Sequence, residues 1–175
     1  MSATPVFPVH SPFVEFLGIR LTDAADGTSE VTLTLADHHL NTWDVVHGGV
    51  VMTLLDIALA SAARSLAQPG TGLVTVEMKT NFMQPGVGVL RARGRVLHKS
   101  STMAYCEGEV LDEKDRLIAK SLGTFKYLRG LAHGRRVMRQ RKSPADPVQT
   151  QDTMDPATPH ESLGSICSNS TVKSR

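Results

Sequence analysis

Residues 48–66 have the sequence GGVVMTLLDIALASAARSL. The stretch contains no proline, and its few polar residues leave apolar side chains on almost every face of a helix. We therefore expect a long helix that is buried nearly all round. Asp56 is the one acidic residue of this stretch. An ionised carboxylate among apolar side chains is costly unless it is hydrogen-bonded, paired or open to a cleft, which makes Asp56 a candidate functional residue.

Six segments around this helix have the patterns of strands. Residues 30–35 alternate apolar and polar side chains, and Asp26-Gly27 before them favours a hairpin turn. The predicted strands are residues 19–22, 30–35, 73–83, 89–98, 102–111 and 117–128. A short helical turn at residues 11–17 precedes them, with a serine as N-cap. One apolar helix can be buried on six antiparallel strands only if the sheet curls around it, which predicts an α+β fold.

Charged residues on two neighbouring strands predict their register. A turn centred near Ser100 would place Arg93 opposite Glu107 and would place Arg91 opposite Glu109. Opposite charges that face each other across an antiparallel pair stabilise the sheet, so we expect this pairing.

Composition places the folded domain in residues 1–128. All the aromatic residues lie there, whereas residues 129–175 are first basic and then rich in proline, serine and threonine, which predicts a disordered tail. The formal net charge is only +2, so we expect neither nucleic acid nor a membrane as a partner. The two cysteines, without a signal-peptide pattern or a transmembrane run, predict free thiols and a cytoplasmic location.

His47-Gly48-Gly49 opens the predicted helix. Glycine leaves the first free backbone N–H groups unshielded, so they could stabilise an oxygen that develops negative charge. Asp56 is eight residues from Gly48, roughly 12 Å along a helix axis, so one chain cannot bring both groups to one carbonyl group. Two antiparallel copies of the helix across a twofold axis would bring them together. The pattern therefore predicts a homodimer with two shared sites.

Asn41, His47-Gly48-Gly49, Asp56 and residues 74–78 (VTVEM) together resemble the phenylacetate-degradation, PaaI-like branch of the hotdog-fold acyl-CoA thioesterases. The resemblance covers about residues 11–128. It implies the hotdog fold, which is a six-stranded antiparallel sheet wrapped around one long central helix. It also implies subunits that associate as dimers or as dimers of dimers.

The same resemblance implies roles for five residues. Asp56 would act as general base or nucleophile, and the backbone N–H of Gly48 would polarise the thioester carbonyl. Asn41 and His47 would orient water or the thioester, and Thr75 would support the carboxylate. From the residues alone, His47 could instead only cap the helix, and Thr75 could be an ordinary strand residue.

The implied substrate is an acyl-CoA thioester, which is hydrolysed to a free acid and coenzyme A without a metal or a bound cofactor. Gly49 and the turn His98-Lys99-Ser100-Ser101 are candidates for binding coenzyme A, because the turn offers positive charge and hydroxyl groups. A solvated hairpin turn is the alternative. No metal-ligand spacing and no nucleotide-binding glycine loop occur in the sequence. Trp43-Asp44 stands where the family more often has small residues, so the acyl group is not assigned.

Two other functions fit part of the pattern. The first is a non-catalytic hotdog module that senses acyl-CoA, although a pure sensor has no need of a buried carboxylate. The second is an acyl-CoA hydratase on the same fold, whose usual spacing of Asp and His does not occur here.

Overall fold

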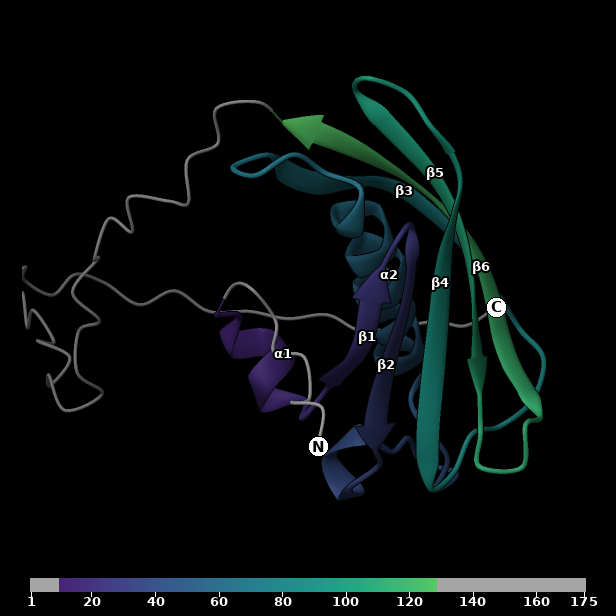
Figure 1. Ribbon diagram of the computed structural model, residues 1–175. Helices are drawn as coiled ribbons and strands as arrows, with labels where there is room; N and C mark the ends of the chain where they lie inside the picture. Colours follow the sequence, from purple (N-terminus) through teal and green to yellow (C-terminus); the bar gives the residue numbers. More distant parts are fainter. Residues whose placement is uncertain (1–9, 129–175) are drawn as a thin grey trace, which may run out of the picture. The chain divides into compact units, whose positions relative to one another are not determined.

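The computed structural model describes residues 10–128, and the predicted tail at 129–175 lies outside these residues. In chain order the elements are α1 (Pro12–Phe16), β1 (Arg20–Ala25), β2 (Thr28–Thr34), the 3-10 turn η1 (Asp37–His39), α2 (Gly48–Ser65), β3 (Gly72–Phe82), β4 (Val89–Lys99), β5 (Met103–Leu111) and β6 (Leu117–Leu128) (Figure 1). Every predicted helix and strand is present, with ends a few residues from the predicted bounds.

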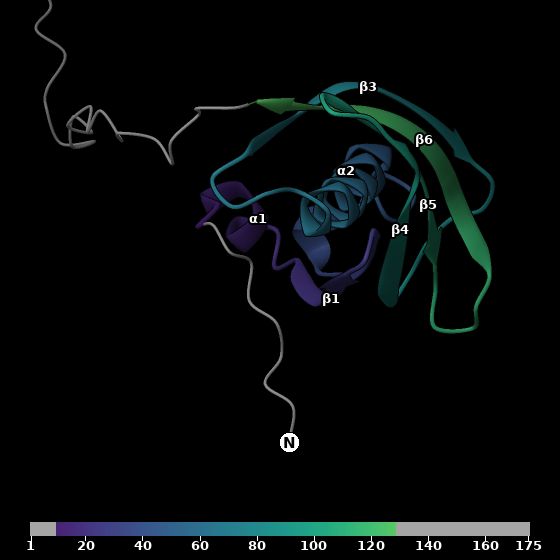
Figure 2. The ribbon, with the colours of Figure 1, turned by 45° about the horizontal axis from the view of Figure 1, so that its top comes forward.

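The six strands form one antiparallel sheet in the order β1-β2-β4-β5-β6-β3, so β1 and β3 are its edges. The sheet curves around α2, which lies in its concave face and packs against all six strands (Figure 2). This arrangement confirms the predicted α+β fold, in which a single long helix is wrapped by the sheet.

The helix lies close to the centre of the sheet because β4 has a glycine there. A Cβ atom on Gly94 would lie only 2.7 Å from the carbonyl oxygen of Ala58, a distance that side chains essentially never show. Ser29 on β2 donates a hydrogen bond from its Oγ to the same oxygen at 2.6 Å. The residues of α2 that are buried in this contact are Val51, Leu54, Leu55, Ala58, Leu59, Ala62 and Ala63.

The other side of α2 is open in the single chain. Met52 is 43% exposed, and Thr53 and Asp56 are half-buried. The prediction that the helix is buried nearly all round was therefore wrong for one chain, because the sheet covers only one side. Of the described residues, α2 forms the one helix long and apolar enough to cross a membrane by length and composition alone, and its position inside the sheet accounts for that composition.

The turns decide the strand pairing. Asp26 and Gly27 both have positive φ, 49° and 79°, as a two-residue hairpin turn requires, and they join β1 to β2 as predicted. The predicted register of β4 and β5 was wrong. Arg93 faces Glu109, because the turn is centred beyond Ser100 and a bulge in β4 shifts the pairing.

Candidate active site

The N-terminus of α2 presents one free backbone donor. The N–H of Gly49 donates to Nδ1 of His47 at 3.0 Å, and the N–H groups of Val50 and Val51 donate to the carbonyl of His47 at 2.9 and 3.3 Å. Within residues 10–128, the N–H of Gly48 has no hydrogen-bond partner. The ring of Phe82 lies beside Gly48, 3.6 Å from where a Cβ would stand. Gly48 is therefore the donor that this helix end can offer to an incoming oxygen.

His47 is the N-cap of α2. Its backbone is extended (φ −64°, ψ 136°), and its side chain accepts the hydrogen bond from Gly49. Because Nδ1 is an acceptor, the neutral ring carries its proton on Nε2. The imidazole is exposed, so this Nε2–H is free to meet a ligand. His47 therefore caps α2, which is one of the two roles that the sequence left open. Its Nε2–H can still act as a hydrogen-bond donor to a ligand.

Asn41 closes the loop before α2. Its Oδ1 accepts a hydrogen bond from the N–H of Trp43 at 2.9 Å, and its own N–H donates to the carbonyl of Val45 at 2.9 Å. Asp44 within this loop has a positive φ of 56°, which Asn and Asp tolerate better than most residues. Asn41 therefore shapes the loop that delivers the chain to Gly48.

Asp56 lies on the open side of α2 and is held from β3. Thr75 donates from Oγ1 to Asp56 Oδ1 at 2.7 Å, and Oδ2 has no hydrogen-bond partner among the described residues. The two residues line an open groove of about 770 Å³ between α1, α2 and β3. Its other lining residues are His10, Ser11, Phe13, Val14, Met52, Thr53, Ile57, Ala60, Ser61, Arg64 and Met78. One carboxylate oxygen is thus fixed, and the other is available at a partly apolar surface.

The structure does not bring all the predicted site residues together. Asp56 and Thr75 form one group, and Asn41, His47 and the two glycines form a second group at the start of α2. The eight-residue separation of Asp56 from Gly48 in an unbroken helix corresponds to roughly 12 Å. Within one chain, Asp56 and Gly48 are therefore separated, as the sequence predicted.

The turn predicted to bind coenzyme A lies at the other end of α2. Lys99 places Nζ 5.6 Å from the ring centroid of Tyr127, whose hydroxyl donates to the carbonyl of Ala63 at 2.8 Å. Ser100 accepts the N–H of Met103 at 2.9 Å and thereby stabilises the turn. His98 and Ser101 are exposed. Since Ala63 is roughly 22 Å along the helix from Gly48, this turn does not meet Gly49 within one chain.

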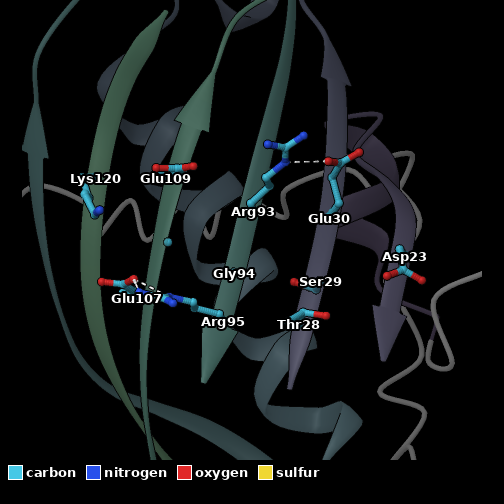
Figure 3. Close-up of a pocket in the computed structure, with 11 residues that line it drawn as sticks. Asp23, Thr28, Ser29, Glu30, Arg93, Gly94, Arg95, Glu107, Glu109 and Lys120 are labelled. Carbon is cyan, nitrogen blue, oxygen red and sulfur yellow. Dashed lines mark hydrogen bonds and ion pairs between the residues drawn. The ribbon is translucent and has the colours of Figure 1, made fainter. Parts of the chain in front are cut away.

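A second hollow, of about 440 Å³, lies on the outer face of the sheet (Figure 3). Its charged side chains largely neutralise each other: Arg93 pairs with Glu30 at 2.8 Å, and Arg95 pairs with Glu107. Such exposed pairs contribute little to stability, and their charges are already partnered. The hollow contains neither Asp56 nor Gly48, so we place the candidate site in the groove beside Asp56.

His39 is a residue that the sequence reasoning missed. It is only 2% exposed, its Nδ1 accepts the N–H of Ala36 at 2.9 Å, and its Nε2 is buried without a partner in the described structure. Burial, helped by the neighbouring His38, lowers the pKa of His39. Its carbonyl accepts the N–H of His47 at 2.8 Å, so His39 supports the start of α2. The pair of histidines just before Asn41 is the sequence signal that could have pointed to it.

Known proteins share this fold and these segments. A family model described as the thioesterase superfamily matches residues 44–119. Over 125 residues the chain is 30% identical to "Putative esterase SSO2140" of Saccharolobus solfataricus, a match that covers 71% of this chain and 89% of that protein. It is 27% identical over 120 residues to "Acyl-coenzyme A thioesterase PaaI" of Escherichia coli, covering 67% of this chain and 84% of that protein.

Two solved structures are similar over the described domain. That of the Escherichia coli PaaI protein has a TM-score of 0.63 at 25% identity, covering 67% of this chain and 85% of the other. That of the BH2602 protein from Bacillus halodurans, solved with CoA, has a TM-score of 0.65 at 28% identity, covering 70% and 82%.

The sheet wrapped around α2 is therefore the hotdog fold, and the fold and the matching segments define a thioester hydrolase. The chain belongs to the thioesterase superfamily, as a hotdog thioesterase of the PaaI-like type.

Proposed function

We propose that the protein hydrolyses acyl-CoA thioesters, with Asp56 as the catalytic carboxylate. The observation that carries this proposal is the state of Asp56 in the groove: Thr75 holds Oδ1 at 2.7 Å, while Oδ2 has no partner in the described residues. A carboxylate fixed by one oxygen and free at the other has the geometry that a general base or a nucleophile needs.

As a general base, Asp56 takes a proton from water while the water oxygen bonds to the thioester carbonyl carbon. The carbonyl electrons move to its oxygen, which accepts a hydrogen bond from a Gly48 N–H. The oxyanion then collapses, the carbon–sulfur bond breaks, and the coenzyme A sulfur leaves with the proton. As a nucleophile, Asp56 would itself bond to the carbonyl carbon, release the coenzyme A thiolate and form a mixed anhydride that water hydrolyses. Both routes require the same two groups.

The Gly48 donor comes from a second copy of the chain in this proposal. Within one chain Gly48 lies roughly 12 Å from Asp56, too far to serve one carbonyl. Two features support a homodimer: the open side of α2, where Met52 is 43% exposed, and the strand β3, which is an edge of the sheet and on which Val76 is 55% exposed. An antiparallel pair of α2 helices would place each Asp56 near the partner subunit's Gly48. Further pairing would give a dimer of dimers.

Asn41, His47 and Thr75 position the reacting groups. Thr75 orients Asp56, and Asn41 shapes the loop that presents Gly48. The Nε2–H of His47 is a donor that could orient water or the thioester. Gly49, whose N–H is already bonded to His47, would contribute its open backbone surface to coenzyme A.

Coenzyme A is the proposed leaving group, a choice supported by the similar BH2602 structure that was solved with CoA. We assign its phosphates to the turn His98-Lys99-Ser100-Ser101, where Lys99 supplies charge. Ser100 is partly engaged in the turn itself, so Lys99 and Ser101 are the stronger contributors. Ala63, which lies beside this turn, is seven residues from Asp56, or roughly 10 Å along the helix, so in an antiparallel dimer the turn would lie on the side of its own Asp56 and the partner subunit's Gly48.

We further propose that the enzyme works in the cytoplasm. Cys106 is a free, buried cysteine, and burial raises the pKa of its thiol to about 11, so it stays protonated and unreactive. A free thiol suits a reducing compartment. Cell fractionation with an antibody to the protein would test this location.

The experiment that tests the function measures thiol release from phenylacetyl-CoA, octanoyl-CoA and acetyl-CoA, with binding of each ester followed by calorimetry. We expect turnover of at least one ester. Binding of an ester without any thiol release would contradict hydrolysis and would instead support an acyl-CoA sensor.

A mixed dimer of two inactive variants tests whether each active site is shared between two subunits. A dimer that combines an Asp56→Asn subunit with a Gly48→Pro subunit keeps one site with both groups intact, if each site uses two chains. We expect this mixed dimer to regain activity that neither variant has alone. If each site lay within one chain, the mixed dimer would be as inactive as its parents.

A further inference from the structure

The groove beside Asp56 contains a second charged group, Arg64. It lies in the last turn of α2, half-buried, with Ser61 one turn before it on the same groove. Neither side chain makes a hydrogen bond or an ion pair to another described residue. Two unpartnered donors therefore face the same end of the groove.

The other arginines show that this is unusual in the described part of the chain. Arg91, Arg93, Arg95 and Arg116 each pair with an acidic side chain. Arg20 is unpaired but exposed on the edge strand β1, and it does not line the groove. Arg64 is thus, in residues 10–128, the one arginine that lines the groove beside Asp56, and it is unpaired.

The spacing along the groove suits a ligand that reaches both groups. Arg64 is eight residues from Asp56, so the two lie roughly 12 Å apart along the helix axis. Between them the groove is lined by Ile57 and Ala60 on α2 and by Met78 on β3, which offer an apolar surface. The groove therefore has a carboxylate at one position, an apolar middle, and a cation with a hydroxyl farther along.

An arginine near a helix C-terminus also interacts favourably with the helix dipole. A lysine would serve that purpose equally well. The guanidinium group differs because its planar donors bind a carboxylate or a phosphate by two parallel hydrogen bonds. Replacement by lysine therefore separates the two roles.

We propose that Arg64, assisted by Ser61, binds an anionic group of the substrate. This inference rests on the proposed function at Asp56 and extends it to the substrate class. The anion has two sources with the same chemistry: a carboxylate at the far end of the acyl chain, or a phosphate of coenzyme A. The first would make the enzyme select acyl groups derived from dicarboxylic acids.

Binding to the Asp56→Asn protein tests the proposal without turnover. The ligands are octanoyl-pantetheine, which is neutral, suberoyl-pantetheine, which adds only a terminal carboxylate, and octanoyl-CoA, which adds the 3′-phosphoadenosine diphosphate group and with it all the phosphates. Calorimetry gives the Kd of each for Arg64→Gln and Arg64→Lys in this background. The matched control is Arg20→Gln, which removes the same charge outside the groove.

We expect Arg64→Gln to raise the Kd of one charged ligand by roughly 10- to 100-fold relative to its effect on the Kd of the neutral ligand, which is the range for a hydrogen bond to a charged group. Arg64→Lys should lose most of the same affinity, whereas Arg20→Gln should not. Weaker binding of suberoyl-pantetheine identifies the acyl carboxylate, and weaker binding of octanoyl-CoA identifies the phosphate. Equal changes for all three ligands, or none, would overturn the role of Arg64. Failure of the proposed function would appear separately, as an absence of thiol release by the unmodified enzyme.

Discussion

The substitution Gly48→Pro removes one hydrogen-bond donor and disturbs little else. Proline has no N–H, and it is favoured at the first position of a helix, which Gly48 occupies. The residue before a proline must be extended, and His47 already is, with φ −64° and ψ 136°. The N–H that is lost has no partner within residues 10–128, so no described backbone hydrogen bond is broken. The substitution therefore isolates the proposed oxyanion donor.

Loss of one oxyanion donor typically lowers kcat by about 10²- to 10³-fold, or roughly 2.7–4 kcal/mol, and we expect Gly48→Pro to fall in this range. Gly48→Ala is the control, because it keeps the N–H and its Cβ would meet only the ring of Phe82 at 3.6 Å, an ordinary contact. The assay is thiol release from the best acyl-CoA substrate, with thermal unfolding of each variant measured in parallel. A folded Gly48→Pro enzyme with the kcat of Gly48→Ala would refute the assignment of this donor.

Three further predictions follow from individual contacts. Thr75→Val removes the hydroxyl that fixes Asp56, so we expect kcat/KM to fall about 5- to 10-fold, a value reduced because Thr75 is exposed. Thr75→Ser keeps the hydroxyl and should stay near wild type. Equal rates for both variants would contradict a role for this hydrogen bond. His39 has a lowered pKa in the folded state, so the unfolded chain binds a proton first as the pH falls below about 6.5. The free energy of unfolding should then decrease with falling pH, by at most about 1.4 kcal/mol per pH unit from this group, and urea titrations of His39→Gln should show a shallower decrease than wild type. Gly94→Ala would place a Cβ 2.7 Å from the carbonyl oxygen of Ala58, so we expect a loss of about 1–3 kcal/mol in the same titration, and unchanged stability would mean that α2 does not lie so close to β4.

The fold could be predicted from the sequence because its signals are local. The proline-free apolar run that became α2 (Gly48–Ser65) and the alternating segments around it each specify their own secondary structure. The register of β4 and β5 could not be predicted in the same way. It depends on where the turn after Ser100 is centred and on a bulge, and neither leaves a mark in the apolar pattern.

The candidate site was predictable only in part. Asp56 was identified by its own unfavourable surroundings, whereas its contact with Thr75 joins residues far apart in the sequence and was implied only by the family resemblance. Burial of His39 and the open side of α2 depend on which surfaces the sheet covers, so no sequence periodicity revealed them. The position of Arg64 in the groove has the same origin.

The measurement that tests the central claim most directly is the rate of thiol release by Asp56→Asn beside wild type, with circular dichroism to confirm that both are folded. The control is Asp23→Asn, which removes an exposed negative charge from the outer face of β1, away from the groove. We expect Asp56→Asn to lose at least about 10²-fold in kcat and Asp23→Asn to retain wild-type activity. A folded Asp56→Asn enzyme that releases thiol as fast as Asp23→Asn would contradict the assignment of Asp56 as the catalytic carboxylate.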